Sequence, residues 1–461
     1  MKRIAIFGAG VAGQDILKEI NQDDDMNYDV LGFLDDNIQI WGKKIINTLV
    51  LGGRSKISEL RKSKKLDEVI IAIPSADGEQ ISEIVKLCSQ VKVGFRIVPR
   101  VKEIIEGRAH LQTLREVKVE DLLGRPVVKA DVEELKDFFT GKTVLVTGAA
   151  GSIGSELSRQ ISAYSPEKIC FFDWWENGLF ELQTEMRRDF PKLKAEYIIG
   201  NMQDKLKVDR EMKRIQPDYV YHAAAYKHVP LMEDHPDEAV KNNVFGTLNF
   251  IKAAVINRVE KFVLVSTDKA ANPINAMGIT KLITEGLAKI YNGKTKFMAV
   301  RFGNVLDSFG SVIPTFRKQI LQGGPVTITD KRMTRYFMTI PEAAQLIIKA
   351  GVIGNGGELF VLDMGKPVKI IDLANNMIRL SGFIPNKDIK IIYTGVRKGE
   401  KISEKLFIDK ESVMTHKEGK IFVTKSMGLD INKLQSRLSK LKDLATSGQK
   451  TDLVRELKSL I

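Results

Sequence analysis

The chain has 461 residues and carries 71 Lys and Arg against 58 Asp and Glu, a net charge of +13. This length exceeds one ordinary hydrophobic core, so we expect two or more folded units. No apolar run is long enough to span a bilayer, and no apolar leader precedes the first strand, so we expect neither a transmembrane helix nor a signal peptide. The lysines are scattered without a basic stripe that alternates with aromatic residues. We therefore expect no nucleic-acid partner and no metal, and leave peripheral contact with an anionic membrane open.

The two cysteines, Cys88 and Cys170, both stand in apolar stretches. Such cysteines are typical core fillers. Two isolated thiols without a disulfide framework indicate a reducing, cytoplasmic compartment.

Residues 1–120 are predicted to form a first α/β unit. An apolar strand at 4–7 runs into the glycine turn Gly8–Gly13 and then a helix, and the strand at 30–34 ends at Asp35. Two further apolar runs predict strands, at 69–73 and 94–98. Glycines in this pattern hold a nucleotide in some proteins and serve tight packing alone in others. The sequence leaves these two interpretations of the first unit open.

A connector at 121–140, with a short helix at 132–139, leads to a second unit at 141–429. This unit begins with an apolar strand at 143–146 and continues with the stretch Thr147–Gly154, which opens a helix. Strand, glycine turn and helix together make a dinucleotide cradle, because the helix N-terminus offers free N–H groups to a pyrophosphate. The residues expected to contact the cofactor here are Gly148, Gly151, Ser152, Ile153 and Gly154.

An acidic residue, Asp173, ends the next apolar run about 20 residues beyond the glycines, at the spacing that this motif requires. A carboxylate there accepts hydrogen bonds from the adenosine ribose and repels a 2′-phosphate. Trp174 and Trp175 follow it, so no basic residue stands ready for such a phosphate. We therefore predict NAD rather than NADP.

Strands and helices continue to alternate up to Arg301, which predicts a parallel, doubly wound sheet. The apolar runs that predict its remaining strands are 197–199, 219–222, 261–265 and 297–300. The pattern then loosens, so we expect a small substrate-binding lobe mainly after residue 304. Residues 430–461 are predicted to form a helical tail with a solvated charged face.

Two groups of side chains are candidates for chemistry. Thr267, Asp268 and Lys269 directly follow the strand at 261–265, and the carboxyl ends of parallel strands are where such sheets hold ligands. Met277 and Lys281 lie four residues apart in a predicted helix, on one face. A hydroxyl, a carboxylate and an amine in sequence supply an orienting donor, an acid and a base.

The chain resembles the extended short-chain dehydrogenase/reductase superfamily and, more narrowly, the CapD-like UDP-N-acetylglucosamine 4,6-dehydratases of polysaccharide and glycan biosynthesis. The stretches that carry the resemblance are Thr147–Gly154, His222–Glu233, Asn243–Thr247, Ser266–Lys269, Arg301–Val305 and Arg397–Lys401. The superfamily has a tyrosine base where Met277 stands, but this branch shares the methionine. Larger relatives carry membrane helices that we do not find in this chain.

The resemblance implies roles for further residues. Asn201 and Met202 would face the adenine, Lys281 would hold the nicotinamide ribose, and Glu400 would take the uridine ribose. The residues implied to line the cofactor are Ala223, Ala224 and Ala225, and those implied to face the substrate diphosphate are Asn304, Arg335 and Arg397. Pairing of the Lys281 helix between subunits would give at least a dimer.

The implied reaction removes water from a UDP-sugar while NAD stays bound. Lys269 would take the C5 proton, Asp268 would protonate the leaving C6 hydroxyl, and Thr267 or Asp268 would take the C4 hydroxyl proton. Two alternatives stay open at this point, a nucleotide-sugar 4-epimerase and a non-catalytic NAD-binding sensor or scaffold.

Overall fold

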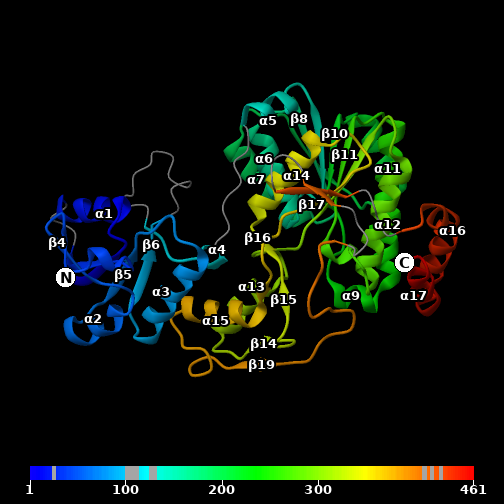
Figure 1. Cartoon of the computed structure of the whole chain (residues 1–461). Coiled ribbons are helices and arrows are strands. Elements are labelled where there is room, and N and C mark those ends of the chain that lie inside the picture. Colours follow the sequence, from blue (N-terminus) through cyan, green and yellow to red (C-terminus); the bar gives the residue numbers. More distant parts are fainter. Residues whose placement is uncertain (23–26, 99–113, 124–131, 408–412, 416–419, 425–428) are drawn as a thin grey trace. The chain divides into compact units, whose positions relative to one another are not determined.

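The computed structural model describes residues 1–22, 27–98, 114–123, 132–407, 413–415, 420–424 and 429–461. Backbone contacts divide the chain into two compact units (Figure 1). Unit 1 comprises Met1–Val127, Val312–Lys331 and Ile370–Thr394, and unit 2 comprises Val128–Ser311, Arg332–Lys369 and Gly395–Ile461. Each compact unit is built from separate stretches of the chain, whereas the predicted domains, with boundaries at 120, 140 and 429, were each one continuous stretch. Within the described ranges, no helix combines the length and the apolar character that crossing a membrane requires.

Unit 1 is an α/β layer built on a six-stranded sheet in the order β3-β4-β2-β1-β5-β6. Its strands are β1 (Lys2–Phe7), β2 (Tyr28–Leu34), β3 (Lys44–Ile45), β4 (Thr48–Gly52), β5 (Glu68–Ile71) and β6 (Gly94–Ile97). Its helices are α1 (Val11–Gln22), η1 (Ile38–Ile40), α2 (Lys56–Lys64), α3 (Gly78–Gln90) and α4 (Val119–Leu123). The later segments add α13 (Val312–Leu321), β14 (Val326–Ile328), α15 (Ile370–Leu380) and β19 (Ile391–Tyr393). All pairs of the main sheet are parallel except β3 with β4.

The side chain of Asp35, which follows β2, forms hydrogen bonds with the glycine turn after β1. Its carboxylate accepts hydrogen bonds from the backbone N–H groups of Ala9 and Asn37, each at 2.9 Å. A Cβ atom on Gly13 would lie 1.9 Å from the carbonyl oxygen of Gly8, so α1 approaches the turn more closely than a side chain allows. Unit 1 therefore has the backbone of a dinucleotide-type cradle.

Helix α15 packs on α3 and α4, inside unit 1. The Ser82 hydroxyl lies 3.3 Å from Asn376 Oδ1, and the Ser89 hydroxyl donates to the Arg379 carbonyl oxygen at 3.4 Å. Leu380 packs against the same core as Cys88. A segment that we assigned to the substrate lobe thus shares a core with the N-terminal sheet.

Unit 2 contains a nine-stranded sheet in the order β20-β21-β17-β12-β11-β10-β7-β8-β9. The sheet strands are β7 (Thr143–Thr147), β8 (Lys168–Asp173), β9 (Ala195–Ile199), β10 (Tyr219–His222), β11 (Lys261–Val265), β12 (Lys296–Arg301), β17 (Leu359–Leu362), β20 (Val413–Thr415) and β21 (Ile421–Thr424). Short strands are β13 (Asn304–Val305), β15 (Thr334–Arg335), β16 (Phe337–Met338) and β18 (Val368–Lys369). β9 to β17 are joined by parallel pairs, and β21 and β20 extend the sheet antiparallel.

Helices cover both faces of this sheet (Figure 1). One face carries α8 (Lys205–Ile215), α11 (Thr247–Ile256) and α12 (Ala276–Tyr291), and the other carries α5 (Val132–Phe139), α6 (Ser152–Ala163), α7 (Glu176–Asp189) and α14 (Ile340–Ile353). The remaining helical elements are α9 (Val229–Asp234), α10 (Pro236–Ala239), η4 (Val240–Gly246), η5 (Asp268–Ala270), α16 (Ile431–Ser447) and α17 (Lys450–Ser459). The α/β expectation is confirmed. Of the predicted connector 121–140, residues 124–131 lie outside the described residues, and the expected helix at 132–139 is α5.

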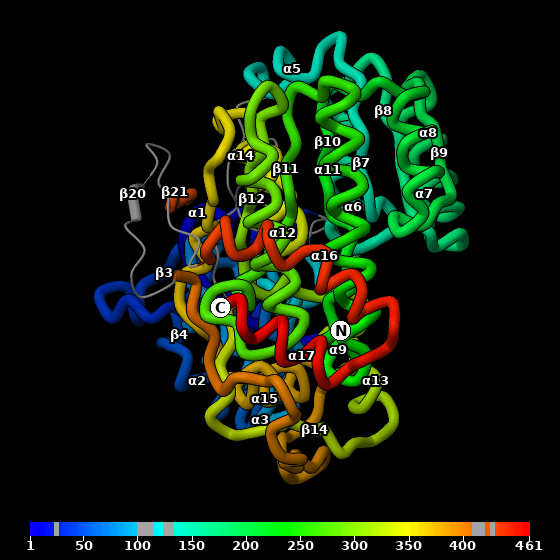
Figure 2. The backbone as a smooth tube through the Cα atoms, turned by 90° about the vertical axis from the view of Figure 1, so that its right-hand side faces the viewer, coloured from blue at the N-terminus to red at the C-terminus, as the bar shows by residue number. Residues whose placement is uncertain are grey.

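The predicted helical tail is a hairpin of α16 and α17, which contact α12 and α10 (Figure 2). Its leucines, Leu434, Leu441, Leu453 and Leu457, are buried in the core that α12 also joins. All residues from Ala276 to Ala288 of α12 are consequently buried within the one chain. We expected this helix to pair between subunits. The expected dimer stays a prediction, and its interface would have to use a surface other than these buried residues of α12.

Candidate active site

The cradle of unit 2 joins β7 to α6 through a turn that requires glycine. Gly148 has φ +68°, and a Cβ atom on it would lie 2.6 Å from the backbone nitrogen of Ala224. A Cβ atom on Gly154 would lie 1.9 Å from the Gly148 carbonyl oxygen, as at Gly13 of unit 1. These close approaches leave the backbone N–H groups at the start of α6 open to a phosphate.

A cavity of about 360 Å³ lies beside this turn, along the carboxyl ends of β7, β8 and β10. Its lining residues include Gly148, Gly151, Asp173, Met202, Ala223, Ala224 and Ala225, all of which the sequence indicated for the cofactor. Phe172, Trp174, Trp175, Gly200, Tyr226 and Asn242 complete the lining. Five residues predicted for the cofactor are not part of this lining, among them Lys281 of α12. Ser152, Ile153 and Gly154 belong to the first turn of α6, and the Asn201 side chain accepts a hydrogen bond from Gln203 N at 2.9 Å.

Asp173, the last residue of β8, forms hydrogen bonds with the glycine turn of unit 2, as Asp35 does with the turn of unit 1. Its carboxylate accepts from the backbone N–H groups of Ala150 and Trp175, both at 2.9 Å. Burial raises the pKa of Asp173, and backbone hydrogen bonds from Trp175, Ala150 and Trp174 oppose that shift. A buried oxygen acceptor at the rim of the cavity suits the hydroxyls of a ribose.

Two residues of the stretches that carry the family resemblance, His222 and Asn243, are sequence neighbours of residues that line the cavity. His222 is fully buried between the hydroxyls of Thr147 and Thr247, at 2.7 and 3.0 Å. Burial lowers the pKa of His222 to about 3, with a smaller contribution from the charge of Lys281, so this imidazole is neutral. Asn243 clamps Tyr226 by accepting from its N–H and donating to its carbonyl oxygen, at 2.8 and 3.0 Å.

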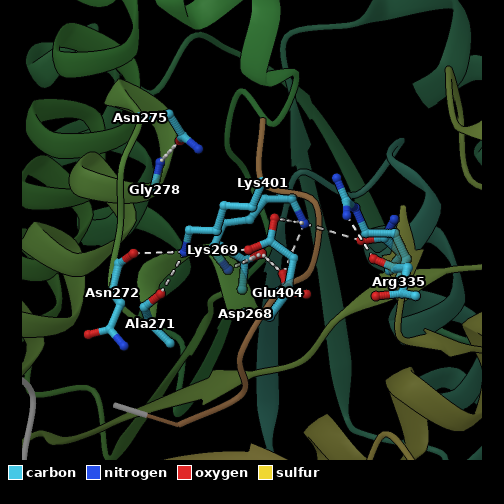
Figure 3. Close-up of polar contacts among 12 residues, drawn as sticks. Asp268, Lys269, Ala271, Asn272, Asn275, Gly278, Arg335, Lys401 and Glu404 are labelled. Atoms are coloured by element: carbon cyan, nitrogen blue, oxygen red, sulfur yellow. Dashed lines mark hydrogen bonds and ion pairs between the residues drawn. The ribbon is translucent and has the colours of Figure 1, made fainter. Parts of the chain in front are cut away.

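The three candidate catalytic side chains form one turn after β11, where η5 begins. Lys269 Nζ lies 2.9 Å from Asp268 Oδ1 (Figure 3). The Thr267 hydroxyl donates to the same oxygen at 3.0 Å. Asp268 has no exposed surface, and its Oδ2 atom makes no hydrogen bond with the described residues. The structure thus brings the predicted hydroxyl, carboxylate and amine into contact, and leaves one carboxylate oxygen available to a proton.

Lys281 lies on α12, whose N-terminus is capped by the Asn275 side chain at 2.7 Å from Gly278 N. Burial lowers the pKa of Lys281 to about 8, against the opposing effect of Glu285. Its ammonium group is therefore easier to neutralise than that of an exposed lysine. The contact of Lys281 with the nicotinamide ribose stays a prediction.

Met277 lies in a small apolar cluster with Val229, Met232 and Ala239. We expect Met277→Leu to retain most of the turnover, because leucine keeps the volume and apolarity of the thioether. Met277→Tyr is expected to give no gain, because its hydroxyl would enter an apolar cluster, at a cost of about 1–3 kcal/mol for a buried unpaired group. Steady-state turnover with thermal melts of both variants checks this. A folded but inactive Met277→Leu would contradict it.

Of the three candidate diphosphate residues, Asn304 contacts the catalytic turn directly. Asn304 Oδ1 accepts from Lys269 Nζ at 3.1 Å. Arg335 is buried, and its Nη1 atom donates to the carbonyl oxygens of Thr334 and Ile402, at 2.7 and 3.1 Å. Arg397 and Glu400 share one exposed turn, in which Glu400 N donates to the Arg397 carbonyl oxygen at 3.1 Å. Their contact with a substrate stays a prediction.

Sequence reasoning assigned no role to three residues, Arg301, Glu285 and Glu404, that lie beside the catalytic turn. Arg301 and Glu285 have no exposed side-chain surface and form a two-pronged ion pair, at 2.8 and 2.7 Å. Ser266 donates to the same Glu285 at 2.5 Å, which anchors the residue before Thr267. Glu404 lies against Lys269 and Lys401, at 3.9 and 3.5 Å. The signal available for Glu285 was its position one helical turn after Lys281.

Comparison with known proteins gives two family matches. Residues 144–426 match the polysaccharide biosynthesis protein family, and residues 1–99 match the CoA-binding domain family. The second match accords with the cradle of unit 1.

Several relatives are similar over much of the chain. The probable polysaccharide biosynthesis protein EpsC of Bacillus subtilis is 46% identical over 88% of this chain and 68% of its own, and the capsular polysaccharide biosynthesis protein CapD of Staphylococcus aureus is 44% identical over the same shares. A UDP-N-acetylglucosamine 4,6-dehydratase (inverting) of Campylobacter jejuni is 35% identical over 66% of this chain and 91% of its own. Among solved structures, Pen from Bacillus thuringiensis superimposes with a TM-score of 0.58 at 36% identity, over 63% of this chain and 90% of that one.

Proposed function

This chain belongs to the polysaccharide biosynthesis protein family, and from that premise we propose that it is a UDP-N-acetylglucosamine 4,6-dehydratase with tightly bound NAD. The observation that carries the proposal is the Asp268–Lys269 pair, with its 2.9 Å contact and the unpartnered Asp268 Oδ2. An acid and a base in contact are what elimination across C5 and C6 of a sugar needs. The Campylobacter jejuni relative, a 4,6-dehydratase by name, supports the same reaction.

The residues around the cavity fit the dinucleotide. The helix N-terminus beyond Gly148 would take the pyrophosphate, Asp173 the adenosine ribose and Lys281 the nicotinamide ribose. When bound, the nicotinamide supplies acceptance of hydride from C4 and its return at C6. This chain's residues then move the protons: Thr267 relays the C4 hydroxyl proton toward Asp268, Lys269 takes the C5 proton, and Asp268 protonates the leaving C6 hydroxyl. Asn304, Arg335 and Arg397 bind the diphosphate, and Glu400 binds the uridine ribose.

A 4-epimerase is the competing activity, since a UDP-glucose 4-epimerase of Rickettsia bellii is 34% identical over 70% of this chain. An epimerase needs no acid–base pair aimed at C5 and C6. The purified chain incubated with UDP-N-acetylglucosamine and NAD is expected to yield a product lighter by one water, identified by mass spectrometry and NMR as a 4-keto-6-deoxy sugar. An isomer of unchanged mass would establish the epimerase, and an unaltered substrate would favour a non-catalytic NAD-binding role.

Cofactor choice can be tested on Asp173. We expect NAD⁺ to bind more tightly than NADP⁺, because a carboxylate at the ribose repels a 2′-phosphate, and Asp173→Asn to narrow the difference. Dissociation constants for both nucleotides measure this. Asp35→Asn is the matched control, because Asp35 makes the same two backbone contacts in unit 1. Tighter binding of NADP⁺ by the unaltered chain would contradict the assignment of Asp173.

A further inference from the structure

Glu404 is a buried carboxylate beside the base, and the reaction above gives it no task. Its side chain is 3% exposed, and its Oε1 atom lies 3.9 Å from Lys269 Nζ. Its Oε2 atom makes no hydrogen bond with the described residues. The Lys401 ammonium pairs with this oxygen at 3.5 Å, so Glu404 lies between the side chains of Lys269 and Lys401.

A count of protons shows a gap in the reaction. The Asp268–Lys269 contact at 2.9 Å is an ion pair, so the pair holds one labile proton at rest. Oxidation of the C4 hydroxyl to a ketone releases hydride to the cofactor and a proton to Asp268, so the pair then holds two. Elimination needs a neutral amine on Lys269 and a neutral acid on Asp268, which together hold one. A third group must therefore accept one proton before the elimination.

We propose that Glu404 is that third group, a proton-holding residue that acts through Lys269. After the C4 proton reaches Asp268, the Lys269 ammonium passes a proton to Glu404. The free amine then takes the C5 proton, Asp268 protonates the C6 hydroxyl, and water leaves. Hydride returns to C6, Lys269 returns its proton to C5, and Glu404 reprotonates Lys269. The resting ion pair is restored, and the balance is the loss of one water.

The geometry around Lys269 supports this exchange (Figure 3). At rest, Asp268 and Asn304 hold the ammonium, at 2.9 and 3.1 Å. Once Asp268 is protonated it loses its charge, and the flexible Lys269 side chain has one nearby carboxylate left in this cluster, Glu404. The gap of 3.9 Å exceeds a hydrogen bond, so a small swing of Lys269 has to close it.

Lys401 holds the Glu404 side chain in place. Its ammonium lies 3.5 Å from Glu404 Oε2 and donates to the carbonyl oxygens of Ala271 and Asn272, at 3.2 and 2.7 Å. Lys227 also faces the cluster, since burial and then the charge of Lys269 lower the pKa of Lys227. The Glu404 carboxylate thus lies within reach of the ammonium groups of both Lys269 and Lys401.

The inference rests on the proposed function, and its test separates the steps of that reaction. The unaltered chain, Glu404→Gln and Glu404→Asp are compared with UDP-N-acetylglucosamine in D₂O. We expect Glu404→Gln to leave KM and the reduction of bound nicotinamide unchanged, because C4 oxidation precedes the missing step. Product formation and deuterium entry at C5 of recovered substrate should fall about 10²-fold or more. Glu404→Asp should restore part of both.

The pH profile and a control complete the test. In Glu404→Gln the extra proton can leave only to solvent, so kcat should rise with pH more steeply than in the unaltered chain. Glu456→Gln removes another buried carboxylate, paired with Arg437 and Lys440, and should change neither readout. Exchange at C5 by Glu404→Gln at the normal rate, or an equal loss of C4 oxidation, overturns the inference. Absence of dehydrated product from the unaltered chain instead overturns the proposed function.

Discussion

Asp268→Asn and Lys269→Ala are each expected to lower kcat by about 10²–10⁴-fold, the usual loss when a positioned acid or base is removed. Asn keeps the shape of Asp268 but cannot donate the proton that the C6 hydroxyl needs. Ala removes the amine that lies 2.9 Å from Asp268 Oδ1, and with it the C5 base. Steady-state turnover of UDP-N-acetylglucosamine measures both losses.

The control for these variants is the uptake of NAD, which should stay near normal because neither side chain lines the cofactor cavity. Thermal melts exclude misfolding, which matters because Asp268 is fully buried. A folded Lys269→Ala variant with full activity would place the C5 base elsewhere and remove the main support of the proposed function.

Breaking the Glu285–Arg301 pair is expected to cause the largest loss of stability. Both side chains are fully buried, and Glu285→Gln removes the negative charge that faces the Arg301 guanidinium. Removal of one partner of such a pair costs about 3–5 kcal/mol. Thermal melts, together with amide hydrogen exchange of α12 peptides, measure the effect and locate it in unit 2.

The double replacement Glu285→Leu with Arg301→Met separates the charge from the packing. Two apolar residues of similar volume often replace a buried pair at little cost, so much of the stability should return. Arg188→Ala breaks an exposed pair with Asp189 and should leave the melting temperature unchanged within scatter. A Glu285→Gln variant as stable as the unaltered chain would show that the pair is not a main support of α12.

The sequence predicted β1, β2, β5 and β6 of one sheet and β7 to β12 of the other, because parallel strands buried on two faces appear as continuous apolar runs. It missed β4 and β17. The edge pieces β3, β20 and β21 are short or antiparallel and lack that signal. Gly148, Gly151 and Asp173 of the cavity lining followed from the spacing of one local motif, whereas Met202 and Ala223 to Ala225 were implied by the family resemblance. In contrast, the packing of α15 on α3 joins residues as far apart as Ser82 and Asn376, and no local pattern reports such a contact.

The catalytic turn was predictable because Thr267, Asp268 and Lys269 are neighbours in the chain. Glu404 was not, because only the folded chain brings the segment after Arg397 back to η5. Its tether is the Lys401 side chain, which donates to backbone carbonyl oxygens rather than to a side chain that a motif would mark. Contacts to backbone leave little trace in a sequence.

The hairpin of α16 and α17 has a consequence for the order of folding. Gly286 of α12 leaves room for Leu429 and Leu434, whose side chains would lie 2.8 and 2.9 Å from a Cβ atom there. The packing of α12, the helix that carries Lys281, is therefore completed by a segment that is synthesised after it. When α12 has left the ribosome but the hairpin has not yet been made, the apolar face of α12 is still uncovered. Contacts between segments far apart in the chain also form more slowly than local ones. Until the hairpin packs, that apolar face is exposed in the nascent chain and is a site where chains can associate.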